Sequence, residues 1–423
     1  MTAQTKGSHC VVTLRRLGAC RRGLGCWLRT RALQQEDPTM SAFVFETAPK
    51  IVCEQGAAQR LGDIARQMGL QQVFLVTDAG LVKAGVIDGA VSALRQAGVT
   101  VHVFSEVLAD PPEASVVSAV TQARSVQADG VIGLGGGSSM DTAKLVALLA
   151  CTPQSLPEVY GVGLARGPRL PLIQIPTTAG TGSEVTPISI VTTPSHEKKG
   201  VVSPLLYPDV AVLDSLLTLG LPPAITAMTG VDAMVHAIEA FTSRHKKNPV
   251  SDALALQALQ LLYQHIRIAV NEGGHADARE RMLQGSLMAG MAFANAPVAA
   301  VHALAYPLGG HYHLPHGLSN SLVLSAVLRF NLPAAQPWYA QLGRAILPVL
   351  HQSDDRTAAE GFVTAMSELV AAMPYPQSLR EAGIEHRDLP KLAHDAMNVQ
   401  RLLINNPREV NLDDALAIYE ASF

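Results

Sequence analysis

Short apolar runs alternate with longer stretches of helical periodicity between residue 40 and about residue 220. Such alternation is typical of buried strands in a parallel sheet connected by crossover helices. The predicted strands are 73–76, 99–104, 130–134, 172–175, 188–192 and 210–213, with a further strand-like run at 42–45. The predicted helices are 57–68, 87–97, 114–125 and 139–151. We therefore expect an α/β domain over residues 40–220.

The pattern changes after the sequence Leu221-Pro222-Pro223. Beyond it, strand signals largely disappear, and long stretches rich in alanine, leucine and methionine run to the C-terminus with helical spacing. We expect an all-helical domain over residues 221–423. A cleft between two such domains is the usual place for a ligand.

Composition narrows the class of protein. Hydrophobic residues make up 48% of the chain and charged residues only 16%, against about 25% charged in an average globular domain. Much of the deficit lies in residues 282–328, which contain no Asp, Glu, Lys or Arg. Prolines and glycines interrupt this stretch and it carries four histidines, so we interpret it as protein interior, not as a membrane span of about 20 apolar residues. The net charge of -3 argues against nucleic acid or an anionic membrane surface as partner.

The first 35 residues contain six arginines and no acidic residue. This composition is typical of a mitochondrial transit peptide, but an upstream start codon, with the true start at Met40, explains it as well and is the interpretation we favour. Residues 1–39 are therefore treated as an extension outside the fold. Three of the five cysteines lie within it, so no disulfide framework is expected and a reducing compartment is favoured. We expect a cytoplasmic protein, or one of the mitochondrial matrix if the extension is a real transit peptide.

A strand followed by three glycines and two serines stands at residues 130–139. Glycines let the backbone pass close to a pyrophosphate, and a helix that starts at the serines directs free N–H groups and its positive dipole end at an anion. The loop lacks the GxGxxG spacing and does not follow the first strand, so it does not indicate an ordinary Rossmann domain. A tight strand-to-helix connection without function is the alternative.

A second polar segment, 177–186, places five hydroxyls, two glycines and one acid directly after a buried strand. Such a loop suits phosphate, ribose or carboxamide groups, although it is also compatible with a solvated loop with capping side chains. Asp78 ends the first strong strand. A carboxylate there can accept a hydrogen bond from a ribose 2′-hydroxyl and repel a 2′-phosphate, which favours NAD over NADP, but strand-end aspartates are often simple turn formers.

Asp232 and His236 are four residues apart in a helix-like segment and so share one helix face. His302 and His316 follow in the uncharged stretch. One carboxylate and three imidazoles form an N/O site suited to Fe(II) or Zn(II). An Asp/His pair alone is more often a structural hydrogen bond, but two further buried histidines favour a metal, because a buried imidazole without a partner is costly.

The motifs resemble those of the iron-containing (group III) alcohol dehydrogenase family from Met40 onward. The similar segments are GGGSSMD at 135–141, TTAGTGSEVT at 177–186, GVDAMVHAIE at 230–239, HALAYPLGG and PHGLSN between 302 and 320, and NPR at 406–408. The resemblance implies a dehydroquinate-synthase-like fold: an α/β N-terminal nucleotide-binding domain plus an all-α C-terminal metal-binding domain. It also implies a homo-oligomer, a dimer or a higher assembly.

By motif, the resemblance implies that NAD and Fe²⁺ (or Zn²⁺) are the cofactors. The implied metal ligands are Asp232, His236, His302 and His316. The implied cofactor-binding residues are Asp78, Gly136, Gly137, Ser138, Asp141, Thr177, Thr178, Thr186 and Lys199.

Two positions depart from the family pattern. Many members have a second histidine where this chain has Tyr306, and many have Asn-Pro-Thr where this chain has Asp-Pro-Pro at 110–112. The usual proton relay is therefore not transferable, and the candidates for it are Tyr306, His311 and His313. The i, i+2 spacing of His311 and His313 is typical of a loop or strand that directs one of them into the cleft.

The expected function is hydride transfer between a small alcohol or aldehyde and nicotinamide, with the metal acting on the substrate oxygen. Within the family, hydroxyacid–oxoacid transhydrogenase, maleylacetate reductase and, more distantly, glycerol dehydrogenase are alternatives; the complete set of four metal ligands counts against the second. A non-catalytic nucleotide or metal sensor is the alternative from another class.

Overall fold

The computed structural model describes residues 42–195 and 197–423, and residues 43–423 form one compact unit. The following description concerns that unit. The predictions made for residues 1–39, a transit peptide or a mis-assigned start, lie outside the described residues.

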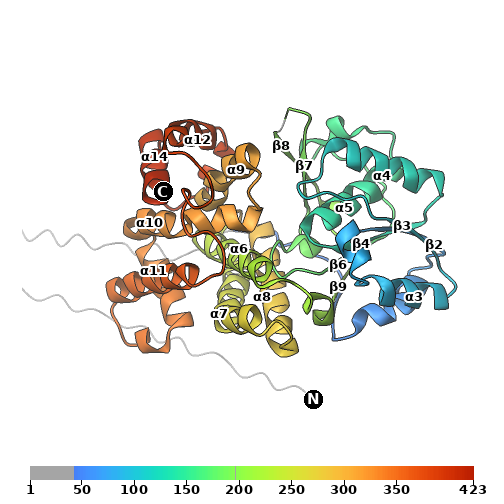
Figure 1. Cartoon of the computed structure of the whole chain (residues 1–423), viewed down its shortest axis with the longest axis horizontal. Helices are drawn as coiled ribbons and strands as arrows, with labels where there is room; N and C mark the ends of the chain where they lie inside the picture. The colour runs from blue at the N-terminus through green and yellow to red at the C-terminus, as the bar shows by residue number, and fades with distance from the viewer. Residues whose placement is uncertain (1–41, 196) are drawn as a thin grey trace, which may run out of the picture. The chain divides into compact units, whose positions relative to one another are not determined.

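A six-stranded sheet forms the centre of the N-terminal half (Figure 1). All its strands are parallel and have the order β1-β9-β6-β4-β2-β3. Their bounds are β1 Ile51–Cys53, β2 Gln72–Val76, β3 Thr100–Phe104, β4 Gly130–Gly135, β6 Leu172–Pro176 and β9 Val210–Leu213. Five of these strands were predicted to within one residue at each end, and β1 was missed.

Helices cover both faces of this sheet. Alternate side chains of β2 show the division: Val73 and Leu75 pack with α1 (Leu61–Gln67) and α3 (Asp88–Gln96), because successive side chains of a strand point to opposite faces. Phe74 and Val76 pack on the other face with α4 and α5. These two helices span Glu113–Ser125 and Gly137–Cys151, and a short helix α2, Ala79–Lys83, follows β2. Because helices cover both faces of the sheet, side chains on both faces of each strand are buried, which explains the continuous apolar runs in the strand sequences.

The strand predicted at 188–192 exists but belongs to a different sheet. β7, Ile188–Thr192, pairs antiparallel with β8, Lys198–Val202, and β8 pairs parallel with β5, Gly161–Val162. The expectation that this strand continues the parallel series is wrong. Its alternation of buried and half-buried positions is typical of a sheet with one covered face, unlike the fully buried β4 and β6.

The strand-like run at 42–45 forms no strand. Phe43 and Val44 are exposed, and no neighbouring strand pairs with them in the described part of the chain. The segment is instead fixed one residue later, where the Glu46 N–H donates to Asn295 Oδ1 at 2.8 Å. An apolar run without a partner strand has no ladder to join, and sequence alone does not show that.

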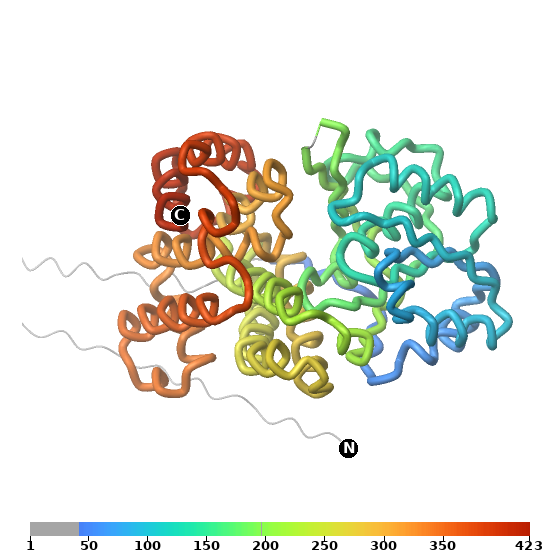
Figure 2. The backbone as a smooth tube through the Cα atoms, viewed as in Figure 1, coloured from blue at the N-terminus to red at the C-terminus, as the bar shows by residue number. Residues whose placement is uncertain are grey.

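After Pro223 every described element is helical, as the change of pattern at Leu221 predicted. α6 lies at the centre and packs against α7, α8 and α10 (Figures 1 and 2). Fifteen of its residues are buried, which is typical of a core helix surrounded by others. The helices are α6 Pro223–Thr242, α7 Pro249–Asn271, α8 Ala276–Asn295, α9 Ala300–Tyr312, α10 His316–Ile346, α11 Asp355–Ala371, α12 Leu389–Met397, α13 Gln400–Leu403 and α14 Leu412–Ala421.

The uncharged stretch 282–328 spans most of α8, all of α9 and the start of α10. Its apolar side chains lie mostly inside the core of the helical half. No single described helix has the length and hydropathy needed to cross a bilayer; α8 and α9 together have both, but they bend by 103° at their junction. The stretch is protein interior, as expected.

Candidate metal centre and cofactor cavity

A cavity of about 280 Å³ lies between the two halves of the unit. We call its lining residues between 110 and 198 the α/β wall and those between 232 and 402 the helical wall. The α/β wall includes Gly137, Ser138, Asp141 and Thr186, and the helical wall includes Asp232, His236, His302, Tyr306 and His316. Residues predicted for cofactor, metal and proton transfer therefore meet in one cavity.

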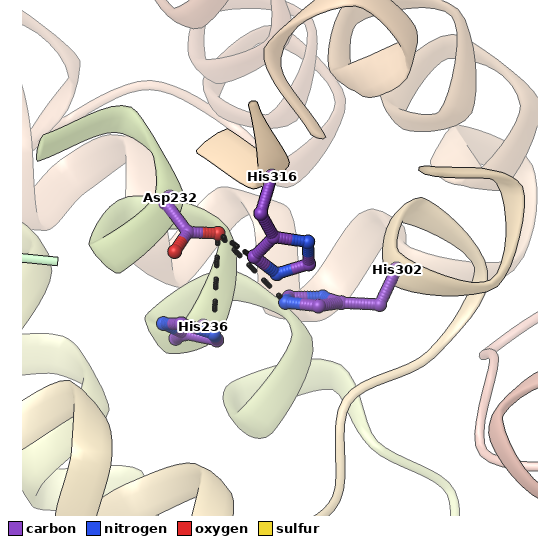
Figure 3. Close-up of side chains that lie close together, drawn as sticks. All are labelled: Asp232, His236, His302 and His316. Carbon is purple, nitrogen blue, oxygen red and sulfur yellow. Dashed lines mark ion pairs between the residues drawn. The ribbon is translucent and has the colours of Figure 1, made fainter. Parts of the chain in front are cut away.

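The four predicted metal ligands converge on the helical wall (Figure 3). α6 supplies Asp232 and His236 from one face, α9 supplies His302 and α10 begins with His316. Asp232 Oδ1 lies 4.0 Å from the Nε2 of His236, 3.9 Å from that of His302 and 3.6 Å from that of His316. One possible ligand atom from each residue lies within 4.8 Å of all the others.

A buried carboxylate orients His302. Glu239, three residues after His236 on α6, accepts a hydrogen bond from His302 Nδ1 at 2.6 Å. Its oxygens also accept from the N–H groups of Ala299 at 2.9 Å and Val301 at 2.6 Å. Because the proton is on Nδ1, the Nε2 lone pair of His302 points toward Asp232, which is the arrangement usually found behind a metal-binding histidine.

The charge states in the cluster favour a cation. Burial opposes ionisation of Asp232, but the three imidazoles and Asn320 outweigh it and hold the pKa of Asp232 below its ordinary value. Burial lowers the pKa of His236, and lowers that of His302 well below its ordinary value. These shifts favour an ionised Asp232 with neutral His236 and His302, the protonation state in which these side chains bind a metal.

The donor set fits a divalent metal ion. Tetrahedral ligands at about 2.1 Å from a metal lie about 3.4 Å from one another, slightly less than the 3.6–4.0 Å separations from Asp232 Oδ1. The Asn320 amide nitrogen lies 2.5 Å from Asp232 Oδ1, 3.3 Å from His302 Nε2 and 3.2 Å from His316 Nε2. Two N–H bonds cannot serve three acceptors, and Asn320 Oδ1 is buried without a partner among the described residues. A cation bound by the three acceptors would satisfy the acceptor that the two Asn320 N–H bonds cannot reach.

The predicted diphosphate loop lies on the α/β wall. α5 begins at Gly137, directly after Gly136, and no side chain caps its first N–H groups, so these groups and the positive end of the helix dipole are available to an anion. A Cβ on Gly137 would lie 2.7 Å from Thr181 Cγ2, whereas one on Gly136 would meet nothing closer than Thr178 at 3.8 Å. Gly137 is required by packing, and Gly136 leaves open space beside the helix start.

Asp141 and Thr186 line the cavity but also connect the two polar segments. Asp141 accepts hydrogen bonds from the Ser183 hydroxyl at 2.6 Å and the Ile190 N–H at 2.9 Å. Lys144 is fully buried and donates to Ser183 Oγ at 2.8 Å and Thr186 Oγ1 at 3.0 Å. These contacts hold the hydroxyl-rich loop against α5, so both predicted cofactor residues have a structural role.

Burial shifts the titrating groups of this connection. It lowers the pKa of Lys144 to about 8 and raises the pKa of Glu184 to about 7. Lys144 was missed by the sequence analysis, although its position three residues after Asp141 on a predicted helix was a signal for an ion pair.

Five predicted cofactor residues lie outside the lining of the cavity: Asp78, Gly136, Thr177, Thr178 and Lys199. Asp78 caps α2 and accepts from the Leu81 N–H at 3.0 Å, which is the turn-forming role kept open as its alternative. Thr177 is buried, and its N–H donates to Gly135 O at 3.0 Å.

Neighbouring lysines on β8 point to opposite sides. Lys199 is half-exposed, lies 3.8 Å from Glu197 and sits over the Tyr160 ring. Lys198 lines the cavity and forms an ion pair with Asp110 at 2.7 Å. Successive side chains of a strand alternate, so the cavity lysine is the residue before the predicted one, and the departure at Asp110 supplies its partner.

Of the three predicted proton-relay residues, only Tyr306 lines the cavity. Its ring centroid lies 6.2 Å from that of His316. His311 lies within α9 and its Nε2 is 2.7 Å from Asp395 Oδ2, so the expectation of a loop or strand at His311 is wrong: helical hydrogen bonding continues to Tyr312. His313 caps the helix in the left-handed region, at φ 54°.

A buried N/O metal site that faces a glycine-rich helix start across one cavity defines a metal- and nucleotide-dependent enzyme. Residues 48–215 match the iron-containing alcohol dehydrogenase family, and residues 226–423 match the C-terminal part of the same family. The chain belongs to the iron-containing alcohol dehydrogenase family. The resemblance and the fold class predicted from the sequence are thereby confirmed.

Several characterised relatives are similar over almost the whole chain. Sulfoacetaldehyde reductase of Bilophila wadsworthia is 38% identical over 90% of this chain and 99% of the relative. Long-chain-alcohol dehydrogenase 1 of Geobacillus thermodenitrificans is 40% identical over 87% of this chain and 93% of the relative.

Solved structures have a similar overall fold. A crystal structure of 1,3-propanediol oxidoreductase is 35% identical, with a TM-score of 0.87 over 90% of this chain and all of that one. Sulfoacetaldehyde reductase from Bifidobacterium kashiwanohense, solved in complex with NAD+, is 30% identical with a TM-score of 0.81 over 90% of this chain and 98% of that one.

Proposed function

We propose that this chain is a metal-dependent NAD(H) alcohol dehydrogenase and aldehyde reductase for small substrates. The observation that carries the proposal is the single cavity that joins four metal-binding side chains to the uncapped start of α5. Membership of the iron-containing family and similarity to a relative solved with NAD+ support iron and NAD as the cofactors.

NADH bound at this site would supply a hydride to the carbonyl carbon of the aldehyde, and the protein would supply a proton to the carbonyl oxygen. Asp232, His236, His302 and His316 would hold a divalent metal, which supplies Lewis acidity at the substrate oxygen. Glu239 keeps the His302 lone pair directed into the site. The helix start at Gly137 would bind the pyrophosphate.

Tyr306 is the proton-relay residue we propose. It is the predicted candidate that lines the cavity, and its ring lies beside His316. His311 and His313, which lie outside the cavity lining, are less suitable for direct contact with substrate.

We also propose a cofactor preference, a domain boundary, an assembly state and a location for this chain. The strand-end carboxylate of Asp78 supports NAD over NADP, although it is engaged with α2. We further propose a boundary between nucleotide and metal domains near residue 220, where the elements become helical, a homo-oligomer, and a cytoplasmic location, which agrees with the two free cysteines among the described residues, Cys53 and Cys151.

The test is a spectrophotometric assay of NADH oxidation with purified, iron- or zinc-loaded protein across short aldehydes, combined with metal analysis. We expect turnover that requires the metal and exchangeable NADH. Tightly bound NAD that does not exchange would instead indicate a transhydrogenase, and a lack of turnover with every aldehyde and alcohol would contradict the proposal.

A further inference from the structure

Charged side chains on the α/β wall have partners, whereas one on the helical wall has no charged partner among the described residues. On the α/β wall, Lys198 is paired with Asp110 at 2.7 Å, and Asp141 is held by Ser183 and Ile190. On the helical wall, Arg401 has no carboxylate partner among the described residues. The only hydrogen bond of its guanidinium to a described residue is a long one, from Nη2 to the Tyr306 hydroxyl at 3.4 Å.

Arg401 is close to the reacting end of the cavity. Its guanidinium lies 5.9 Å from the centre of the Tyr306 ring, and that ring is in turn 6.2 Å from the ring of His316. One tyrosine ring therefore separates the cation from the metal site.

The other residues that line the helical wall are apolar. Phe293, Pro297, Val298 and Leu402 line the same wall. A short carbon chain is compatible with this surface. Arg401 is exposed in the free protein, and a bound substrate that displaces water from the apolar wall beside it strengthens an ion pair with its guanidinium. A planar guanidinium with free N–H groups binds carboxylate or sulfonate oxygens well.

We propose that the substrates are short aldehydes and alcohols that carry an anionic group, carboxylate or sulfonate, at the end remote from the reacting carbon, and that Arg401 binds this group. The inference rests on the proposed function and adds a substrate class to it. Arg401 is then a specificity-determining residue: it acts on the substrate charge and takes no part in hydride transfer.

The experiment compares an anionic and a neutral aldehyde of equal length. With metal-loaded enzyme, kcat/KM is measured for succinate semialdehyde and for butanal, and for sulfoacetaldehyde to distinguish sulfonate from carboxylate. We expect the wild type to favour at least one anionic aldehyde over butanal by about tenfold, mainly through KM, with the preference decreasing as salt is added.

Three variants locate the effect. Arg401→Met keeps the apolar stem and removes the charge, and we expect it to lose about tenfold in kcat/KM for the anionic aldehyde while butanal changes by no more than about twofold. Arg401→Lys is expected to restore part of the loss. Arg267→Met is the matched control, because Arg267 is an exposed arginine 5.6 Å from the Tyr263 ring but lies outside the cavity lining.

An equal loss for anionic and neutral aldehydes would overturn the proposal, as would a loss of NADH affinity that accounts for the whole effect, since Arg401 would then act on Tyr306 or on the cofactor. Calorimetric binding of 4-hydroxybutyrate, compared with 1-butanol, tests the same contact without turnover. Preferential binding lost in Arg401→Met supports the proposal even if no aldehyde is reduced, whereas equal binding of both alcohols contradicts it. Reduction of butanal without any anion preference would leave the proposed function intact and remove this inference.

Discussion

On the α/β wall of the cavity, charged groups are bound to one another, whereas on the helical wall ligand atoms face each other across a gap. Lys198 pairs with Asp110 at 2.7 Å, and behind this wall the buried Lys144 donates to Ser183, Thr186 and the Ile188 carbonyl. Asp232 Oδ1 instead faces three imidazole nitrogens at 3.6–4.0 Å. Buried polar groups need partners; the charged groups of the first wall have partners within the chain, whereas the ligand atoms of the second wall are arranged to be satisfied by a metal.

The difference between the two walls suits two tasks, reversible binding of a nucleotide and lasting binding of a metal. A nucleotide site that must release its cofactor in each cycle benefits from a wall that keeps its shape without the ligand. A metal that stays bound can serve as part of the structure, because its binding free energy adds to folding free energy. The following changes test this division.

The largest effect is expected from His316→Ala. Removing one of four ligands should lower metal occupancy and reduce kcat by about 10³-fold or more, since Lewis acidity at the substrate oxygen is lost with the ion. Metal analysis and the NADH assay on the same sample measure both. His265→Ala is the control, because the one hydrogen bond that the His265 side chain forms with a described residue is to the Leu261 carbonyl on α7. Full activity of His316→Ala without metal would refute the ligand assignment.

Glu239→Gln should weaken the metal site without removing a ligand. In the structure one carboxylate oxygen accepts from Ala299 and His302 and the other accepts from Val301. Glutamine has a single acceptor oxygen, so its NH₂ group must face at least one of these donors, and the orientation of His302 is less well fixed. We expect metal affinity to fall about 10- to 100-fold, measured by competition with a chelator. Unchanged affinity would show that Glu239 does not orient His302.

Gly136→Ala tests the other wall. The added methyl meets nothing closer than 3.8 Å within the chain, and the backbone at φ -75° accepts alanine without strain. The thermal midpoint should therefore change little, but the methyl occupies the space where a pyrophosphate would approach α5, and we expect NADH affinity to fall about tenfold. Wild-type NADH affinity in this variant would place the pyrophosphate elsewhere.

Glu184→Gln probes the buried polar connection behind the α/β wall. Burial raises the pKa of Glu184 to about 7, so the folded state holds its proton more tightly than the unfolded state between pH 4.5 and 7. Wild-type stability from this group therefore decreases as pH rises through that window.

The variant cannot lose a proton, so its stability relative to wild type should increase from pH 4.5 to 7 and then level off. A gain of about 1–3 kcal/mol at pH 8 is expected. Thermal denaturation at several pH values measures it, and Glu368→Gln, an exposed glutamate on α11, is the control. A parallel pH profile for Glu184→Gln and wild type would contradict the shifted pKa.

The sequence predicted the metal centre better than its surroundings. Asp232 and His236 share a helix face at i, i+4 spacing, and His302 and His316 stood out in a segment without charge. Glu239 carries no such signal, because its contact with His302 spans 63 positions. The choice between Lys198 and Lys199 depends on which face of β8 meets the cavity, and that register is set by pairing with β7.

The errors in the predicted fold have the same cause, because they too depend on contacts between residues far apart in the sequence. Residues 188–192 have a strand pattern, but the sheet they join depends on β8, whose polar sequence Lys198-Lys199-Gly200 gave no strand signal. Arg401 lies in a short helix whose position beside Tyr306 is produced by packing of α13 against α9. Local pattern predicts elements, and long-range packing decides which of their side chains share a site.

Titration of NADH into metal-free protein tests the central claim most directly. Because the charged groups of the α/β wall have partners within the chain, we predict that NADH binds the metal-free protein with an affinity within about threefold of the metal-loaded protein, while turnover is restored only when metal is added. Loss of NADH binding on metal removal would show that the two walls form one coupled site and would contradict the division described above.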